Sequence, residues 1–167
     1  MSEIKAEPIS KVSIVVSHGS LEGVYPGLIM ANGARMEGIE ASLFFTFFGL
    51  YGIMEKTMDY LRVATVGNPA MRVPDAKGFP MPTLLGAIPG VSAFATGMMK
   101  KEMEKLDIPP VREFLQMISD AGGEIYACKA TVDMFHLKKD DFFKEVNGII
   151  SVGQFYEKAA GGQIIFT

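Results

Sequence analysis

The sequence predicts an α/β fold, a three-layer αβα sandwich built around a mostly parallel sheet of about five strands. Short runs of β-branched and other apolar residues alternate with longer stretches in which apolar residues recur at helical intervals. The 167 residues also match the size of one ordinary domain, which buries a core without disulfides or a structural metal. We therefore expect a single domain over residues 1–167.

A strand–helix–strand unit opens the chain. Residues 12–17 are rich in β-branched side chains and run into a turn at His18, which predicts a buried first strand. Residues 25–37 carry apolar side chains at helical intervals, and Gly38 follows as a helix stop. Residues 39–45 are the second predicted strand, so we expect parallel strands joined by a right-handed crossover.

The middle of the chain changes character after a third predicted strand. Residues 55–60 predict the end of a short helix, and residues 61–66 predict the strand. The stretch 67–90 holds five prolines and several glycines, a density that excludes a long regular element. Irregular segments of this length in compact domains are typically functional, so we interpret residues 67–90 as a lid over the edge of the sheet.

Regular patterns return from residue 92 onward. Residues 92–106 and 111–121 predict helices, and Pro110 is well suited to open the second. Strands are predicted at 124–128 and 163–167. Shorter helical stretches are predicted between them, at residues 130–135, 138–143 and 151–160.

Composition and charge narrow the possible partners. A formal net charge of −3 and a pI near 5.4 argue against binding to phosphate backbones, so no nucleic acid is expected. The first residues are partly acidic and lack the apolar core of a secretory signal, so we expect a cytoplasmic protein. The most apolar stretch, residues 41–54, is shorter than the roughly 20 residues of a transmembrane span. The apolar middle of the chain favours self-association into a homo-oligomer.

Cys128 is the only cysteine of the chain and the main candidate for a catalytic residue. It lies where the predicted strand 124–128 meets the predicted helix 130–135. The free N–H groups and the dipole at the start of a helix stabilise a thiolate at such a position. The alternative is that Cys128 is a small buried hydrophobic residue, as free cysteines often are.

Two further residues are candidate supporting groups. Ligands of an open parallel sheet bind beyond the carboxyl ends of its strands, which places His18 and Cys128 at the same edge. His18 is a candidate general base or persulfide hydrogen-bond donor, with a structural hydrogen-bonding role as the alternative. Lys129 follows the thiol and would stabilise its anion, unless it belongs with Asp133 to a solvated helix face. His136 is expected to be exposed.

No cofactor and no metal site are predicted. Residues 18–23 invite comparison with a phosphate loop but match neither GxGxxG nor GxxxxGK[ST]. No Cys/His cluster has the spacing of a metal site. A soft-metal site would need methionines that fit a core or a lid better, namely Met71, Met81, Met98 and Met99.

Two other functions stay open at this point. One is a noncatalytic module that docks its apolar central segment on a partner or a membrane surface, with Cys128 as a core residue. The other is a binder of a small cofactor or nucleotide at the strand ends, with residues 18–20 as an anion-binding loop. Neither of these two functions requires the Cys128 thiol, whereas sulfur chemistry does.

The sequence around Cys128 resembles that of the DsrE/DsrF-like family of small sulfur-trafficking proteins. The resemblance rests on the motif GGEIYAC, on the following KATVDMFHLKKDDFF, and on the terminal GIISVGQFYEKAAGGQIIFT. Residues 31–34 and 39–52 agree in the N-terminal half, so the resemblance covers nearly the whole chain. It is closest to larger members with a Pro/Gly/Met-rich insertion, here residues 67–97, and implies one DsrE/DsrF-like domain with a parallel-sheet α/β fold.

This resemblance implies a sulfur carrier with sulfurtransferase-like activity. In the family, the cysteine at the position of Cys128 accepts sulfane sulfur as a persulfide and passes it on. Typical partners are a rhodanese or a small TusA-like carrier, and members commonly form homo- or hetero-oligomers. Some similar members have a second cysteine in the central segment, which is absent here. A one-thiol relay from Cys128 to an acceptor thiol therefore fits this chain better than disulfide chemistry.

Overall fold

Five parallel strands form one sheet in the computed structural model, which describes residues 8–68, 70–72 and 80–167. The strands are β1 (Lys11–Val16), β2 (Glu40–Phe45), β3 (Glu124–Cys128), β4 (Gly148–Ile150) and β5 (Gln163–Phe166). Their order across the sheet is β4-β3-β2-β1-β5, and every neighbouring pair is parallel. The predicted α/β fold class is confirmed.

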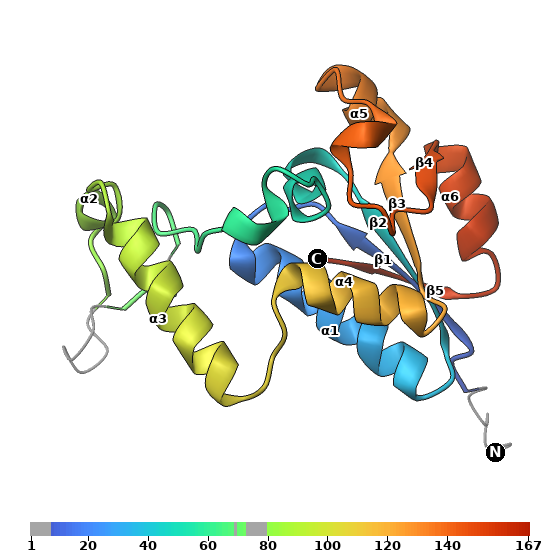
Figure 1. The fold of residues 1–167 in the computed structure, drawn as a ribbon, viewed down its shortest axis with the longest axis horizontal. Helices are drawn as coiled ribbons and strands as arrows, with labels where there is room; N and C mark the ends of the chain where they lie inside the picture. Colours follow the sequence, from blue (N-terminus) through green and yellow to red (C-terminus); the bar gives the residue numbers. More distant parts are fainter. Residues whose placement is uncertain (1–7, 69, 73–79) are drawn as a thin grey trace, which may run out of the picture.

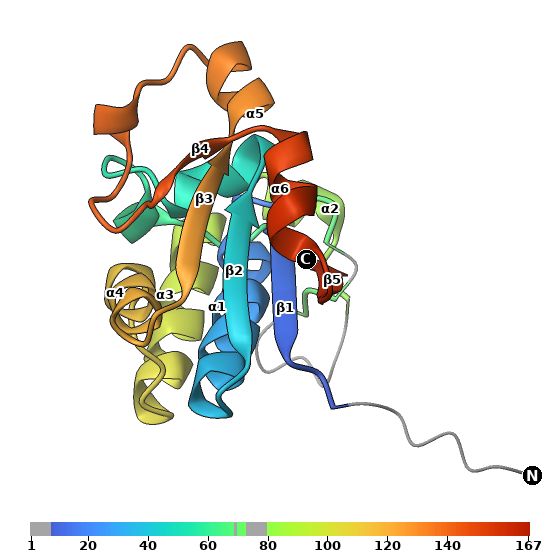
Figure 2. The ribbon, with the colours of Figure 1, turned by 90° about the vertical axis from the view of Figure 1, so that its right-hand side faces the viewer.

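Helices cover both faces of the sheet (Figures 1 and 2). The helices are α1 (Leu21–Met36), α2 (Thr83–Gly86), α3 (Val91–Lys105), α4 (Val111–Asp120), α5 (Lys129–Met134) and α6 (Val152–Ala159). Three 3₁₀ turns are η1 (Phe47–Gly52), η2 (Met58–Tyr60) and η3 (Lys139–Asp141). Helices α1 and α4 pack side by side on one face, and α6 lies on the other, which gives the three predicted layers.

Alternation along the strands divides the buried side chains between the two faces. On β3, Ile125 and Ala127 belong to the large core beneath α1 and α4, whereas Tyr126 and Cys128 belong to a smaller cluster beneath α6. The members of the smaller cluster are Val15, Phe44, Tyr126, Cys128, Ile150, Phe155 and Ala159. Cys128 therefore lies in apolar surroundings between the sheet and α6.

Residues 61–66 are not a strand, so this prediction is wrong. Their side chains alternate between buried and exposed, as in a strand, but their backbone groups bond to helices. The Arg62 carbonyl accepts a hydrogen bond from the Leu21 N–H at the start of α1. The Val63 N–H donates to the Thr96 hydroxyl of α3 at 2.9 Å. Alternation reports burial on one side of a segment and carries no information about its backbone partners.

The strand that completes the sheet is β4, which the sequence pattern did not predict. Its three residues are too few for an alternating pattern to stand out. It pairs with the end of β3, where Cys128 lies opposite Ile150. The other predicted strands and helices agree with the structure to within a few residues at their ends, although α1 begins about one turn earlier than predicted. The helical stretches predicted at 55–60 and 138–143 are only short 3₁₀ turns, η2 and η3.

The central segment extends away from the sheet. Figure 1 shows α2 and α3 at the opposite end of the molecule from α5. Helix α3 is attached through the hydroxyls of Ser92 and Thr96, which bond to the backbone of Val63. The described part of residues 67–97 thus lies away from the carboxyl end of β3 in this structure. A lid function for this segment stays a prediction.

Helices α2 and α3, together with the turn that joins them, expose large apolar side chains. These are Leu84, Leu85, Ile88, Phe94, Met98 and Met99. Among the helices that the structure describes, none is both long enough and apolar enough to cross a membrane. This surface departs from the usual pattern of buried apolar and exposed polar residues.

Candidate functional site

Cys128 lies at the carboxyl edge of the sheet, where β3 ends and α5 begins. It occupies the N-cap position of α5, but its side chain caps no N–H group, and a helix of six residues has only a small dipole. The side chain is 4% exposed. Within the described part of the chain, the thiol has no hydrogen-bond partner. Only a small part of the Cys128 side chain is therefore open to a reactant from solvent.

Two threonine hydroxyls lie near this end of β3, and sequence reasoning missed both. Thr46 directly follows Phe45, whose partner in the β2–β3 register is Ala127, the residue before Cys128. Thr131, in the first turn of α5, has its Oγ1 3.1 Å from the Thr46 Oγ1. Hydroxyls of this kind donate hydrogen bonds to a sulfur anion. One signal was present in the sequence, since Thr46 is the polar residue within the apolar run 43–50.

The charged side chains near Cys128 are directed toward other partners. Lys129 is exposed, and its Nζ lies 3.0 Å from an Asp133 carboxylate oxygen, as in a solvated helix face. Lys158 lies toward the other end of β3, where its Nζ is 3.4 Å from a Glu124 carboxylate oxygen and 4.6 Å from the centroid of the Tyr126 ring. Its interaction with Tyr126 raises the pKa of Lys158, and burial raises the pKa of Tyr126. Among the described residues, no cation is paired with the thiol.

His18 lies at the same edge of the sheet but not next to the thiol. It is exposed, and its Nδ1 is 3.0 Å from the Ser17 hydroxyl. Strand β2 lies between β1, which leads to His18, and β3, which ends at Cys128. The expectation that the two residues share an edge is met, but the structure does not bring His18 into contact with the sulfur. His136 is exposed, as expected.

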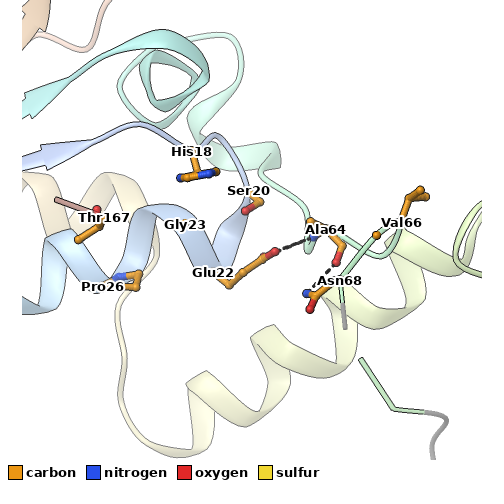
Figure 3. Close-up of a pocket in the computed structure, with 10 residues that line it drawn as sticks. His18, Ser20, Glu22, Gly23, Pro26, Ala64, Val66, Asn68 and Thr167 are labelled. Carbon is orange, nitrogen blue, oxygen red and sulfur yellow. Dashed lines mark hydrogen bonds between the residues drawn. The ribbon is translucent and has the colours of Figure 1, made fainter. Parts of the chain in front are cut away.

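His18 instead lines a separate cavity of about 540 Å³ at the start of α1 (Figure 3). The Glu22 carboxylate accepts a hydrogen bond of 3.0 Å from the Ala64 N–H, and the Asn68 amide donates to the Ala64 carbonyl. A phosphate group in this cavity would meet the negative charge of Glu22, which disfavours a nucleotide. Within the described residues, no three His, Cys, Asp or Glu side chains come together as a metal site.

Comparison with known proteins identifies relatives over nearly the full chain. Residues 9–166 match the model of the DsrE/DsrF/DrsH-like family. The chain is 33% identical over 156 residues to the sulfur carrier protein DsrE2 of Allochromatium vinosum, which covers 92% of this chain and 95% of that protein. It is 21% identical over 145 residues to the uncharacterized protein YrkE of Bacillus subtilis, which covers 84% of this chain and 86% of that protein.

Solved structures with little sequence identity share the fold. The YchN protein of E. coli superposes with a TM-score of 0.55 at 10% identity, over 95% of this chain and 100% of that one. MTH1491 of Methanobacterium thermoautotrophicum, a protein of unknown function, gives 0.54 at 10% identity, over 94% and 98% of the chains. Because the family model spans nearly the whole sequence and a relative is 33% identical over 92% of it, this chain belongs to the DsrE/DsrF/DrsH-like family.

Proposed function

We propose that this chain is a sulfur carrier that accepts sulfane sulfur as a persulfide on Cys128 and relays it to an acceptor thiol. The observation that carries the proposal is the 33% identity, over nearly the whole chain, with the sulfur carrier protein DsrE2. Cys128 is the only cysteine, so no other residue of the chain can hold a persulfide. Its position at the ligand-binding edge of a parallel sheet supports the proposal.

The proposed relay consists of two exchange steps that need no redox partner. In the first, the Cys128 thiolate attacks the terminal sulfur of a donor persulfide, R–S–SH. The S–S bond of the donor breaks, the donor leaves as the thiolate R–S⁻, and Cys128 carries the group S–SH. In the second step, an acceptor thiolate attacks the terminal sulfur and releases the Cys128 thiolate.

Side chains at the edge have distinct proposed contributions. The Thr46 and Thr131 hydroxyls lie at the ends of the paired strands β2 and β3 and are suited to donate to a persulfide anion. Lys129 supplies a positive charge at the surface, which its pairing with Asp133 weakens. His18 would act only through a bound partner or ligand, because β2 lies between it and Cys128.

The proposed partners follow from the resemblance to the DsrE/DsrF-like family. A rhodanese is the proposed sulfur donor and a small TusA-like carrier the proposed donor or acceptor, with the exchange taking place in the cytoplasm. A homo-oligomer is proposed because α2 and α3 expose a large apolar surface, with Leu84 and Phe94 exposed by 85% and 64%.

Loading with sulfur tests the proposed function. The purified chain is incubated with polysulfide, or with thiosulfate and a rhodanese, and the peptide that contains Cys128 is analysed by mass spectrometry. We expect this peptide to gain the mass of one or more sulfur atoms, which a reductant removes. Cys128→Ser should gain none, since a serine hydroxyl forms no persulfide. A wild-type chain that stays unmodified under conditions that load a control carrier contradicts the proposal.

Two other functions each rest on one observation. The exposed apolar surface of α2 and α3 favours a noncatalytic module that docks on a partner or a membrane surface. The cavity beside His18 favours a binder of a small ligand at the strand ends. The loading experiment separates both from sulfur transfer, because neither requires the Cys128 thiol.

A further inference from the structure

Exposed aromatic rings lie beside the carboxyl end of β3. Turn η1 carries Phe47 and Phe48, which are 55% and 56% exposed, together with the less exposed Tyr51. We refer to these three residues as the aromatic rim. Large aromatic side chains are normally buried, and here the large core lies directly beneath the same turn, where Leu50 is completely buried.

The aromatic rim is bonded to the helix that starts at Cys128. The Phe47 N–H donates a hydrogen bond of 3.1 Å to the Thr131 hydroxyl, in the first turn of α5. The Phe48 ring lies 6.0 Å from the Phe135 ring at the other end of α5. The Phe47 N–H is thus bonded to a residue three positions after Cys128, so the aromatic rim and the residues that follow the thiol meet at the carboxyl edge of the sheet.

Phe47 holds an unfavourable backbone conformation. Its φ of 46° is in the left-handed region, which is uncommon for a bulky residue that is not glycine. The close contact of Gly49 with β1, and the bond from its N–H to the Ser17 carbonyl, keep the turn in this shape. Backbone strain of this kind clusters at functional sites, and here it presents an aromatic ring to solvent.

The charge of the turn indicates the kind of partner. Residues 46–54 contain no charged side chain, so inorganic polysulfide, an anion, finds no attraction there. An apolar surface of a partner protein would bind this turn favourably, because aromatic rings bury much area with few rotatable bonds. The relay through a lone thiol also requires every donor and acceptor to be a separate molecule, whose sulfur must reach a side chain that is 4% exposed.

We propose that the aromatic rim is the docking surface for the protein that exchanges sulfur with Cys128. This inference rests on the proposed function. The partner is a small carrier protein whose persulfide-bearing cysteine lies in an apolar surface. Docking on Phe47 and Phe48 holds its terminal sulfur against the Cys128 thiolate while the exchange takes place. The aromatic rim has no role in loading by small sulfur donors.

Two sulfur donors separate docking from chemistry. The rate of sulfur arrival on Cys128 is measured with a TusA-like carrier protein persulfidated on its cysteine, and separately with inorganic polysulfide. Phe47→Ala combined with Phe48→Ala should lower the rate from the protein donor by about tenfold or more, as for residues that dominate an interface. The rate from polysulfide should stay within about twofold of wild type. Phe166→Ala removes a comparably exposed ring on β5, which β1 and β2 separate from β3, and should change neither rate.

The variant Phe47→Gly tests whether a lower transfer rate comes from the lost ring or from a destabilised fold. Glycine adopts a φ of 46° without strain, so this variant should be at least as stable as wild type and still lose most of the transfer from the protein donor. Unchanged protein-donor rates in these variants, or equal losses with both donors, would overturn the inference. A wild-type chain that polysulfide does not load would instead overturn the proposed function, before any variant is compared.

Discussion

At the scale of single residues, Tyr25 connects α1 to the chain between α3 and α4. Its hydroxyl donates a hydrogen bond of 2.9 Å to the Pro109 carbonyl. Its ring packs edge-on against Phe114 of α4, with 6.2 Å between the ring centroids. Burial raises the pKa of Tyr25 from 10.0 to about 12, so the folded protein holds the phenol neutral over a range in which the unfolded chain ionises it.

This difference predicts a loss of stability in alkali. Because the folded pKa lies above the unfolded value, the stabilisation is complete below pH 10 and is lost as the pH rises toward 12. We expect the free energy of unfolding to fall by up to about 1.4 kcal/mol per pH unit from this group. Tyr25→Phe should fall less steeply and should be about 1 kcal/mol less stable at pH 7, where it lacks the hydrogen bond.

Urea denaturation at pH 7, 10 and 11 measures both effects. Tyr60→Phe is the matched control, because Tyr60 is exposed and its substitution should leave the pH dependence unchanged. Equal slopes above pH 10 in wild type and Tyr25→Phe would contradict the assignment of the raised pKa to this residue.

At the scale of elements, turn η1 depends on its close approach to β1. The Gly49 N–H donates to the carbonyls of Ser17 and Thr46 at 3.0 and 2.9 Å. A Cβ atom at Gly49 would overlap the Val16 carbonyl oxygen, so only glycine fits here. The same contact sets the position of η1 above the sheet, and with it the position of Phe47 beside α5.

Two glycine substitutions with opposite expected signs test this arrangement. Gly49→Ala should lower the free energy of unfolding by about 2 kcal/mol or more, since backbone must move to relieve the overlap. Gly33→Ala, at an exposed position of α1 with open space around it, should raise stability by about 0.5–1 kcal/mol through helix propensity. Urea denaturation measures both, and a Gly49→Ala protein as stable as wild type would mean that the turn can move away from β1.

At the scale of the whole molecule, the helices differ in how firmly they are packed. Helix α4 buries Val111, Phe114, Leu115 and Ile118 against the sheet and α1, whereas α3 buries only Thr96. Helix α3 lies away from the sheet in Figure 1. Local opening costs less where few apolar side chains are buried, so α3 should open more readily than α4.

Hydrogen exchange measures this difference. In dilute solution at pH 7, the amides of α3 should exchange at least about tenfold faster than those of α4, which take part in the main core. Self-association through the exposed apolar surface would slow the exchange of α3 as the protein concentration rises. Equal protection of the two helices at every concentration, down to the most dilute, would contradict the expected difference in packing.

The fold could be predicted from the sequence wherever local pattern decided the outcome. The β-branched run of β1, the helical spacing of α1 and the glycine pair after α4 mark their elements correctly. The strand predicted at residues 61–66 is wrong because their side chains alternate in burial as in a strand, while their backbone hydrogen bonds go to α1 and α3. Strand β4 was too short to carry a pattern, and only its pairing with β3 defines it.

The candidate site was predictable in part for the same reason. Cys128 at the junction of a strand and a helix is a local feature, and the structure places it there. Thr46 and Thr131 meet only because β2 and β3 are neighbours, so no local pattern could reveal them. His18 and Cys128 share an edge, but the strand order places β2 between them.

The sequence by itself determined the strand–helix alternation, the parallel α/β class and the single thiol at the end of a strand. These follow from the periodicity of neighbouring residues, which acts over a few positions of the chain. The tertiary structure alone decided the strand order, the burial of Cys128, the position of α3 away from it and the exposed, left-handed Phe47. Each of these features depends on contacts between residues far apart in the sequence. The local sequence pattern is compatible with several arrangements, and long-range hydrogen bonding and packing determine which one forms.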